Sequence, residues 1–155
     1  MAVASGETTF TVWAHRDGPE ITHSSAIEGG RVTMLPWTKG NGVAVGEGLA
    51  ELALGQPPLR VDIVGETKVG SAGDVPVWVL GPCGVIKALH SSILRVAEDR
   101  GARPLFPGVV GDNFKPHTAK HLGPNTLYAG MRLVLPDLAV VDVKGEVLQT
   151  IRLGA

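Results

Sequence analysis

The sequence has little of what small domains use for covalent or metal-based stabilisation. Its 155 residues include a single cysteine, Cys83, which excludes an intramolecular disulfide and a zinc site built from several cysteines. Carboxylates and cysteines nowhere cluster at the spacing of metal ligands, so we expect neither a metal ion nor a cofactor. A single thiol suits a reducing compartment, and we therefore expect a cytoplasmic location.

The chain also lacks an excess of charge of one sign and long hydrophobic runs. With 14 basic and 15 acidic residues its formal net charge is -1, which gives no basis for binding duplex DNA. The longest apolar stretches, at 75–80 and 133–141, are too short or too interrupted to cross a bilayer. The N-terminal MAVASGETTF has neither the basic nor the apolar region of a signal peptide. We expect no membrane segment.

What is present is the composition of a globular domain. Hydrophobic residues make up 44% and charged residues 19% of the chain, a balance that allows a packed core. The 21 glycines and 11 prolines predict many turns between short strands. At this length we expect residues 1–155 to form a single domain.

Hydrophobic periodicity predicts an α+β fold with a two-lobed, antiparallel or mixed sheet and two main helices. The predicted strands are 8–15, 31–37, 59–66, 75–80, a short strand within 114–122, 132–143 and 146–153, and the predicted helices are 43–54 and 84–100. Strands 59–66 and 75–80 are expected to form one hairpin, and the last two strands another. In 31–37, alternation places Arg31, Thr33 and Leu35 on one face of the strand.

Two short segments carry the side chains most suited to chemistry: RVTMLP at 31–36 and FKPHTA at 114–119. Their layout resembles the two-histidine (2H) phosphoesterase superfamily, which includes RNA 2′-5′ ligase-like proteins and cyclic nucleotide phosphodiesterases. In that family each half of the fold supplies a strand bearing His-x-Thr or His-x-Ser. The resemblance covers most of the chain, and it implies a 2H phosphoesterase-like fold and a reaction without a metal ion.

The spacing of that motif has a physical reason. Residues i and i+2 of a strand point to the same face, so each half projects a histidine and a hydroxyl into one cleft. A neutral imidazole can take a proton from a hydroxyl while a protonated one donates to the leaving oxygen. The two hydroxyls hold the phosphate oxygens.

This sequence departs from the family pattern at two of the four positions. Arg31 stands where the first histidine is expected, and Ala119 replaces the second hydroxyl. His117 therefore remains as the candidate acid or base, with Arg31 and Thr33 as candidate phosphate ligands. Thr118 is a further candidate ligand, although in a regular strand it would face away. Arginine cannot act as a base near neutral pH, but it binds phosphate in a bidentate manner.

Other residues are weaker candidates for the same site. His23 and Ser25 also form a His-x-Ser motif shortly before the Arg31 strand, while Trp37 could line the site and stack on a base. Lys115 could add positive charge. The plainer alternatives are a solvated strand face at 31–33 and a turn at His117. His90, beside the apolar stripe of the helix at 84–100, is interpreted as a boundary residue.

The resulting hypothesis is a degenerate 2H phosphoesterase-like domain that binds a 2′,3′-cyclic or 2′-5′ phosphoester, as an RNA end or a cyclic nucleotide, with weak or lost catalysis. The alternative is a structural or assembly module without enzymatic activity. Small, turn-rich, near-neutral chains of this kind occur among phage proteins, so a virion component is one example. The sequence leaves open a homo-oligomer or an assembly with other proteins.

Overall fold

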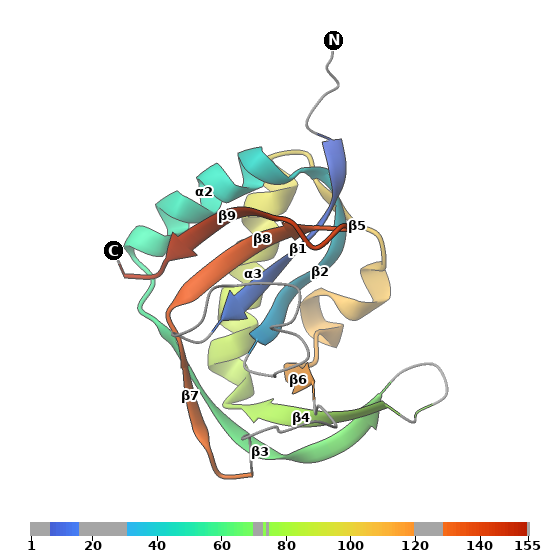
Figure 1. The fold of residues 1–155 in the computed structure, drawn as a ribbon, viewed down its shortest axis with the longest axis vertical. Coiled ribbons are helices and arrows are strands. Elements are labelled where there is room, and N and C mark those ends of the chain that lie inside the picture. Colours follow the sequence, from blue (N-terminus) through green and yellow to red (C-terminus); the bar gives the residue numbers. More distant parts are fainter. Residues whose placement is uncertain (1–6, 16–30, 70–72, 74, 120–128, 155) are drawn as a thin grey trace.

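Among the residues that the structure describes, two antiparallel sheets and two α-helices make up the fold (Figure 1). The computed structural model describes residues 7–15, 31–69, 73, 75–119 and 129–154. Within these residues, the five-stranded sheet has the order β5-β2-β1-β8-β9 and the four-stranded sheet the order β6-β4-β3-β7. Every pairing between neighbouring strands is antiparallel. The predicted α+β class is confirmed.

The strands and helices of the described residues have the following bounds. The five-stranded sheet contains β1 (Glu7–His15), β2 (Arg31–Asn41), β5 (Arg103–Pro104), β8 (Asp137–Asp142) and β9 (Val147–Arg152). The four-stranded sheet contains β3 (Leu59–Val69), β4 (Val75–Gly81), β6 (His117–Ala119) and β7 (Arg132–Leu135). The helices are α2 (Gly42–Leu54) and α3 (Cys83–Asp99), and two short 3₁₀ helices, η1 (Pro107–Val109) and η2 (Gly111–Asn113), precede β6. Both predicted helices and both predicted hairpins, β3–β4 and β8–β9, are confirmed.

The prediction of one strand over 132–143 is wrong. The chain divides at Pro136 into β7, which pairs with β3, and β8, which pairs with β1 in the other sheet. Proline has no amide hydrogen to donate to a neighbouring strand, and it restricts the residue before it. The chain therefore passes from one sheet to the other at this point.

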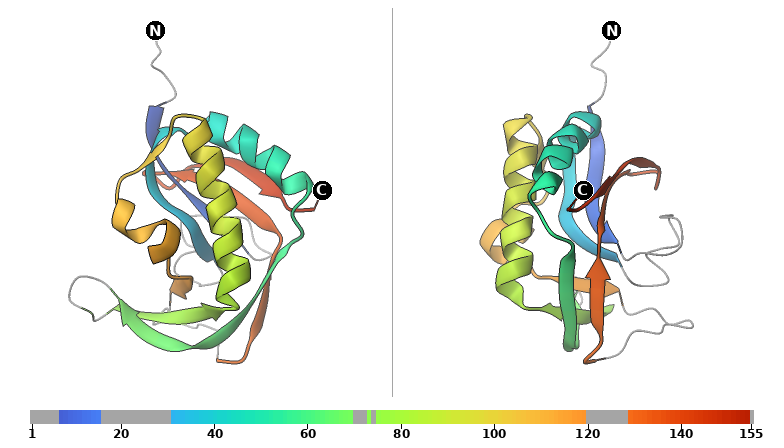
Figure 2. Two further views of the ribbon diagram at one scale, coloured as in Figure 1. Left: turned by 180° about the vertical axis from the view of Figure 1, so that it is seen from behind. Right: turned by 90° about the vertical axis from the view of Figure 1, so that its left-hand side faces the viewer.

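The core lies between the sheets and the two helices. Figure 2 shows both helices on the same side of the five-stranded sheet. Along β1, the alternating residues Phe10, Val12 and Ala14 are fully buried on that side, as the period of two predicts. Helix α3 contacts β2 of one sheet and β4 of the other, so its apolar stripe joins the two sheets.

Strand β2 is irregular where it passes β1. Val12 pairs with Leu35 and Trp13 with Thr33, so β2 has an additional residue between two neighbouring pairs. This bulge turns Leu35 into the core, where it is fully buried, and the prediction that Leu35 shares a face with Arg31 is wrong. The hydroxyl of Thr11 donates to the Leu35 carbonyl at 2.6 Å and satisfies a backbone group in the irregular stretch.

Gly48, one of three buried glycines in α2, allows close packing against α3. Near Gly48 an added Cβ would lie 2.6 Å from Cγ1 of Val96 on α3. Glycine costs a helix interior about 1 kcal/mol relative to alanine. Its presence here is explained by the contact with α3, which has no room for a methyl group.

We therefore expect Gly48→Ala to lower the free energy of unfolding. Overpacking costs about 1–3 kcal/mol, which exceeds the roughly 1 kcal/mol gained in helix propensity. Urea denaturation followed by circular dichroism measures the difference. Gly84→Ala in α3 is the matched control, because an added Cβ there has no atom within 4 Å. Greater stability of Gly48→Ala than of Gly84→Ala would contradict this account.

Candidate functional site

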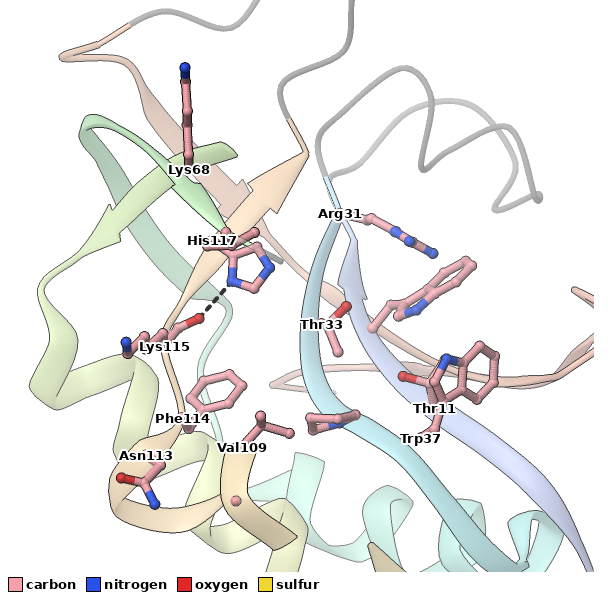
Figure 3. A pocket seen from close by; sticks show the side chains of 14 residues that line it. Thr11, Arg31, Thr33, Trp37, Lys68, Val109, Asn113, Phe114, Lys115 and His117 are labelled. Carbon is pink, nitrogen blue, oxygen red and sulfur yellow. Dashed lines mark hydrogen bonds between the residues drawn. The ribbon is translucent and has the colours of Figure 1, made fainter. Parts of the chain in front are cut away.

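A cleft of about 750 Å³ is lined by residues from both sheets and from the segment that precedes β6 (Figure 3). This volume lies within the range of small-molecule sites. Its lining residues are Thr11, Trp13, Arg31, Thr33, Pro36, Trp37, Lys68, Val69, Gly108, Val109, Asn113, Phe114, Lys115 and His117. Five of the residues singled out from the sequence, namely Arg31, Thr33, Trp37, Lys115 and His117, are among them.

The two motif segments meet at this cleft. Arg31 is the first residue of β2 and His117 the first of β6, and Figure 3 shows His117 and Thr33 on opposite sides of the cleft. The hydroxyl of Thr118 donates to the backbone carbonyl of Arg31 at 2.5 Å. This hydrogen bond joins one sheet to the other directly beside the cleft.

The same hydrogen bond places Thr118 outside the cleft, which departs from its predicted role as a phosphate ligand. Its side chain is 2% exposed and its hydroxyl proton is already donated to Arg31. The regular strand geometry that turns His117 into the cleft turns the next residue away from it. His23 and Ser25 lie outside the described residues.

The imidazole ring of His117 is oriented by a hydrogen bond to a nearby backbone carbonyl. Its Nδ1 lies 2.7 Å from the carbonyl oxygen of Lys115, as Figure 3 shows. A carbonyl only accepts, so Nδ1 carries the proton in this hydrogen bond. In the neutral ring Nε2 then has a lone pair, and this is the atom that can exchange a proton with a ligand.

Arg31 lies against an aromatic ring. Its guanidinium carbon is 3.8 Å from the centre of the Trp13 ring, a cation–π contact, and Figure 3 shows the guanidinium directed away from His117. Burial lowers the pKa of Arg31 to about 10. The side chain thus remains positively charged at neutral pH and cannot act as a base.

The charged side chains among the described residues that line the cleft are all basic. Arg31, Lys68 and Lys115 are lining residues, whereas no aspartate or glutamate is present among the described residues that line it. Trp37 adds an aromatic surface that is 37% exposed. Such a lining favours an anion that carries an aromatic or apolar group.

His90, beside the cleft, is a core residue and not the boundary residue that the sequence predicted. The ring is fully buried and stacks on Phe114, with centroids 3.9 Å apart and planes 2° from parallel. Its Nδ1 lies 2.7 Å from the Met34 carbonyl, and its Nε2 accepts from the Gly111 amide at 2.9 Å. With one nitrogen donating and the other accepting, the ring is neutral and protonated at Nδ1.

We expect acid to destabilise the protein through His90. Burial lowers the pKa of His90, the hydrogen bond to Met34 opposes this shift, and the charge of Lys87 adds to it. Below the ordinary histidine pKa of 6.5, the unfolded state therefore binds more protons than the native state. The stability contributed by neutral His90 is complete above that pH and is lost as the pH falls through the lowered pKa.

Urea denaturation at pH 7.5, 6.0 and 5.0 tests this expectation in the native protein and in His90→Phe. The free energy of unfolding should fall more steeply toward acid in the native protein, because His90 is the one ionisable group by which the two proteins differ. Equal slopes would show that His90 does not contribute.

Two further observations concern the whole of the described chain. Among the residues that the structure describes, no three His, Cys, Asp or Glu side chains gather where they could hold a metal ion. Neither of the described helices is long and apolar enough to cross a membrane.

Comparison with known proteins does not identify a family. No family model matches the chain, and no curated protein matches it. Among solved structures it is similar to the protein TT0787 of Thermus thermophilus, with a TM-score of 0.48 and 18% sequence identity. The match covers 92% of this chain and 83% of that one. Likeness at this level says nothing about ligand or activity.

Proposed function

We propose that this chain is a degenerate 2H phosphoesterase-like domain that binds a 2′,3′-cyclic or 2′-5′ phosphoester in the cleft, with weak turnover. The observation that carries this proposal is that His117, Arg31 and Thr33 all line one cleft. The sequence places them in two distant segments, and the resemblance to the 2H motifs pairs those segments.

The lining supports a phosphate ester as the ligand. A guanidinium donates two parallel hydrogen bonds to phosphate oxygens, and Arg31 keeps its charge at neutral pH. Thr33, two residues along the strand, can donate a further hydrogen bond from its hydroxyl. Lys68 and Lys115 add positive charge to the same cleft. A nucleobase attached to the phosphate could stack on the exposed ring of Trp37.

The same lining supports weak catalysis. Hydrolysis of a 2′,3′-cyclic phosphate forms a P–O bond to water and breaks one ring P–O bond. It takes one proton from the attacking water and delivers one to the leaving sugar oxygen. His117 Nε2 can serve one of these transfers at a time, and Arg31 can serve neither. Loss of one general acid or base costs about 10²–10⁴-fold in rate.

Calorimetric titration with 2′,3′-cyclic AMP and with a 2′-5′-linked dinucleotide tests the proposal. We expect at least one to bind, and Arg31→Ala to weaken its affinity about 10- to 100-fold, as for the loss of a charge-assisted hydrogen bond. Arg60→Ala is the matched control, because Arg60 is exposed on β3 and is not a lining residue. Hydrolysis of the cyclic nucleotide should be slow in the native protein and should fall to the uncatalysed rate in His117→Ala.

Three results would contradict parts of the proposal. Absence of binding by both ligands would remove it as a whole. Equal weakening in Arg31→Ala and Arg60→Ala would show that binding occurs elsewhere. Equal hydrolysis by the native protein and His117→Ala would remove the catalytic part alone. Size-exclusion chromatography of the same samples addresses the alternative, since a ring or larger assembly without ligand binding would favour an assembly module.

A further inference from the structure

His90 is hydrogen-bonded through its two ring nitrogens to the two segments that carry the candidate site. The Met34 carbonyl, which accepts from Nδ1, belongs to the residue directly after Thr33 in β2. The Gly111 amide, which donates to Nε2, is at the start of η2, in the segment that leads to β6. One side chain from α3 is thereby bonded to the two segments that carry the candidate site.

The face of the ring makes a third contact with the same segment. His90 stacks on Phe114, which is 4% exposed and is a lining residue of the cleft. The residue after Phe114 is Lys115, whose carbonyl holds Nδ1 of His117. The position of the His117 ring therefore depends on a short stretch of chain that rests on His90.

We propose that His90 is a positioning residue that holds the Arg31–Thr33 strand and the Phe114–His117 segment in register across the cleft. The hydrogen bond from Thr118 to Arg31 joins the same two segments at the β6 end. The segments are thus connected at two separate points, through His90 and through the Thr118 hydrogen bond. Connection at two points restricts the rotation of one segment relative to the other as well as the distance between them. A test of this role by ligand affinity rests on the proposed function. A test by the position of the His117 ring does not.

His90 occupies a position in α3 that an apolar side chain would ordinarily fill. The neighbouring buried positions of α3, Ile86, Leu89 and Ile93, are apolar, and an apolar side chain would avoid the desolvation of two ring nitrogens. The cost is offset only because both nitrogens have backbone partners. Both of those partners belong to the segments that line the cleft.

The test compares three variants of the full chain. His90→Phe keeps a ring to stack on Phe114 and removes both hydrogen bonds. His90→Asn restores a donor near the place of Nδ1, toward the Met34 carbonyl. Ile93→Ala is the control for lost packing, because Ile93 is fully buried in the same helix and is not a lining residue. The readouts are the midpoint of thermal unfolding, the affinity for 2′,3′-cyclic AMP and the NMR resonances of the His117 ring.

We expect His90→Phe to shift the His117 resonances and to weaken binding about tenfold or more, because misplacement by 1 Å can cost as much as 10²-fold at an active site. His90→Asn should recover part of the affinity. Ile93→Ala, with an equal or larger fall in the unfolding midpoint, should leave affinity within about twofold of the native value, a small change beside a tenfold one.

Unchanged His117 resonances in His90→Phe would overturn the proposal, as would equal loss of affinity in His90→Phe and Ile93→Ala. If the native protein binds neither phosphoester, the proposed function fails, and the His117 resonances still decide whether His90 positions the ring. If circular dichroism shows that His90→Phe is unfolded, His90→Leu, which also lacks both hydrogen bonds, takes its place. Altered His117 resonances in that variant then support the proposal, and native ones overturn it.

Discussion

Replacing Arg31 by histidine is expected to raise the rate of 2′,3′-cyclic nucleotide hydrolysis by about 10²–10⁴-fold, the contribution of one general acid or base. Arg31 stands two residues before Thr33 on β2, and both are lining residues of the cleft. Its guanidinium cannot exchange a proton at neutral pH, since its pKa is about 10. An imidazole there could take one proton while His117 gives the other. Steady-state kinetics of Arg31→His, with product followed by phosphorus NMR, measure kcat and KM separately.

The split between kcat and KM separates this explanation from a simple change in binding. Arg31→His removes a charge that binds phosphate, so KM should rise while kcat increases. Arg31→Lys is the matched control, because lysine keeps the charge without a usable base, and its kcat should stay low. Addition of His117→Ala to Arg31→His should remove the gain. If Arg31→His is no faster than Arg31→Lys, the missing histidine is not what limits turnover.

The largest loss of stability among residues of the site is expected for Phe114→Ala. Truncating a buried phenylalanine costs about 3–5 kcal/mol, and Phe114 is 4% exposed and stacks on His90. The change should lower the free energy of unfolding in urea by that amount. It should also abolish ligand binding, because the chain that leads to His117 would lose its support.

Phe106→Ala is the matched control for this prediction. Phe106 precedes η1 in the same connection and is 57% exposed. Its truncation should change the free energy of unfolding by no more than about 0.5 kcal/mol. If both variants lose similar stability, the stack between Phe114 and His90 does not contribute what its burial indicates.

Periodicity was sufficient to predict most of the fold, because each regular element has an apolar face that repeats at its own period. The alternation of Phe10, Val12 and Ala14 identifies β1, and the stripe that includes Ile86, Leu89 and Ile93 identifies α3. The proline at 136 was visible within the predicted strand 132–143. Its effect, which moves the chain into the other sheet, depends on which strands are available to pair, and local sequence does not contain that information.

Candidate site residues that belong to a sequence motif could be predicted. Those that reach the cleft only because one strand pairs with another could not. Arg31, Thr33 and His117 stand in two recognisable segments. Trp13 is a lining residue because it pairs with Thr33 across β1 and β2, and only the register reveals this. Lys68 lies in β3 beyond the predicted end of that strand at residue 66.

His90 illustrates a different limit. Its partners are a backbone carbonyl and a backbone amide from two distant segments, and every residue except proline carries both groups. Nothing in the identity of residues 34 or 111 indicates a histidine partner. A polar residue beside an apolar stripe was the available signal, and it equally fits a helix boundary.

The passage of the chain from β7 to β8 has a consequence for the synthesis of the protein. Strand β1 lies between β2 and β8 in its sheet (Figure 1), yet β8 and β9 leave the ribosome after all the other described strands. Until they emerge, one edge of β1 has no backbone partner from β8. Contacts between segments so distant in sequence form slowly. We expect the nascent chain to complete the five-stranded sheet, whose strands β1 and β2 line the cleft, only as the hairpin of β8 and β9 docks.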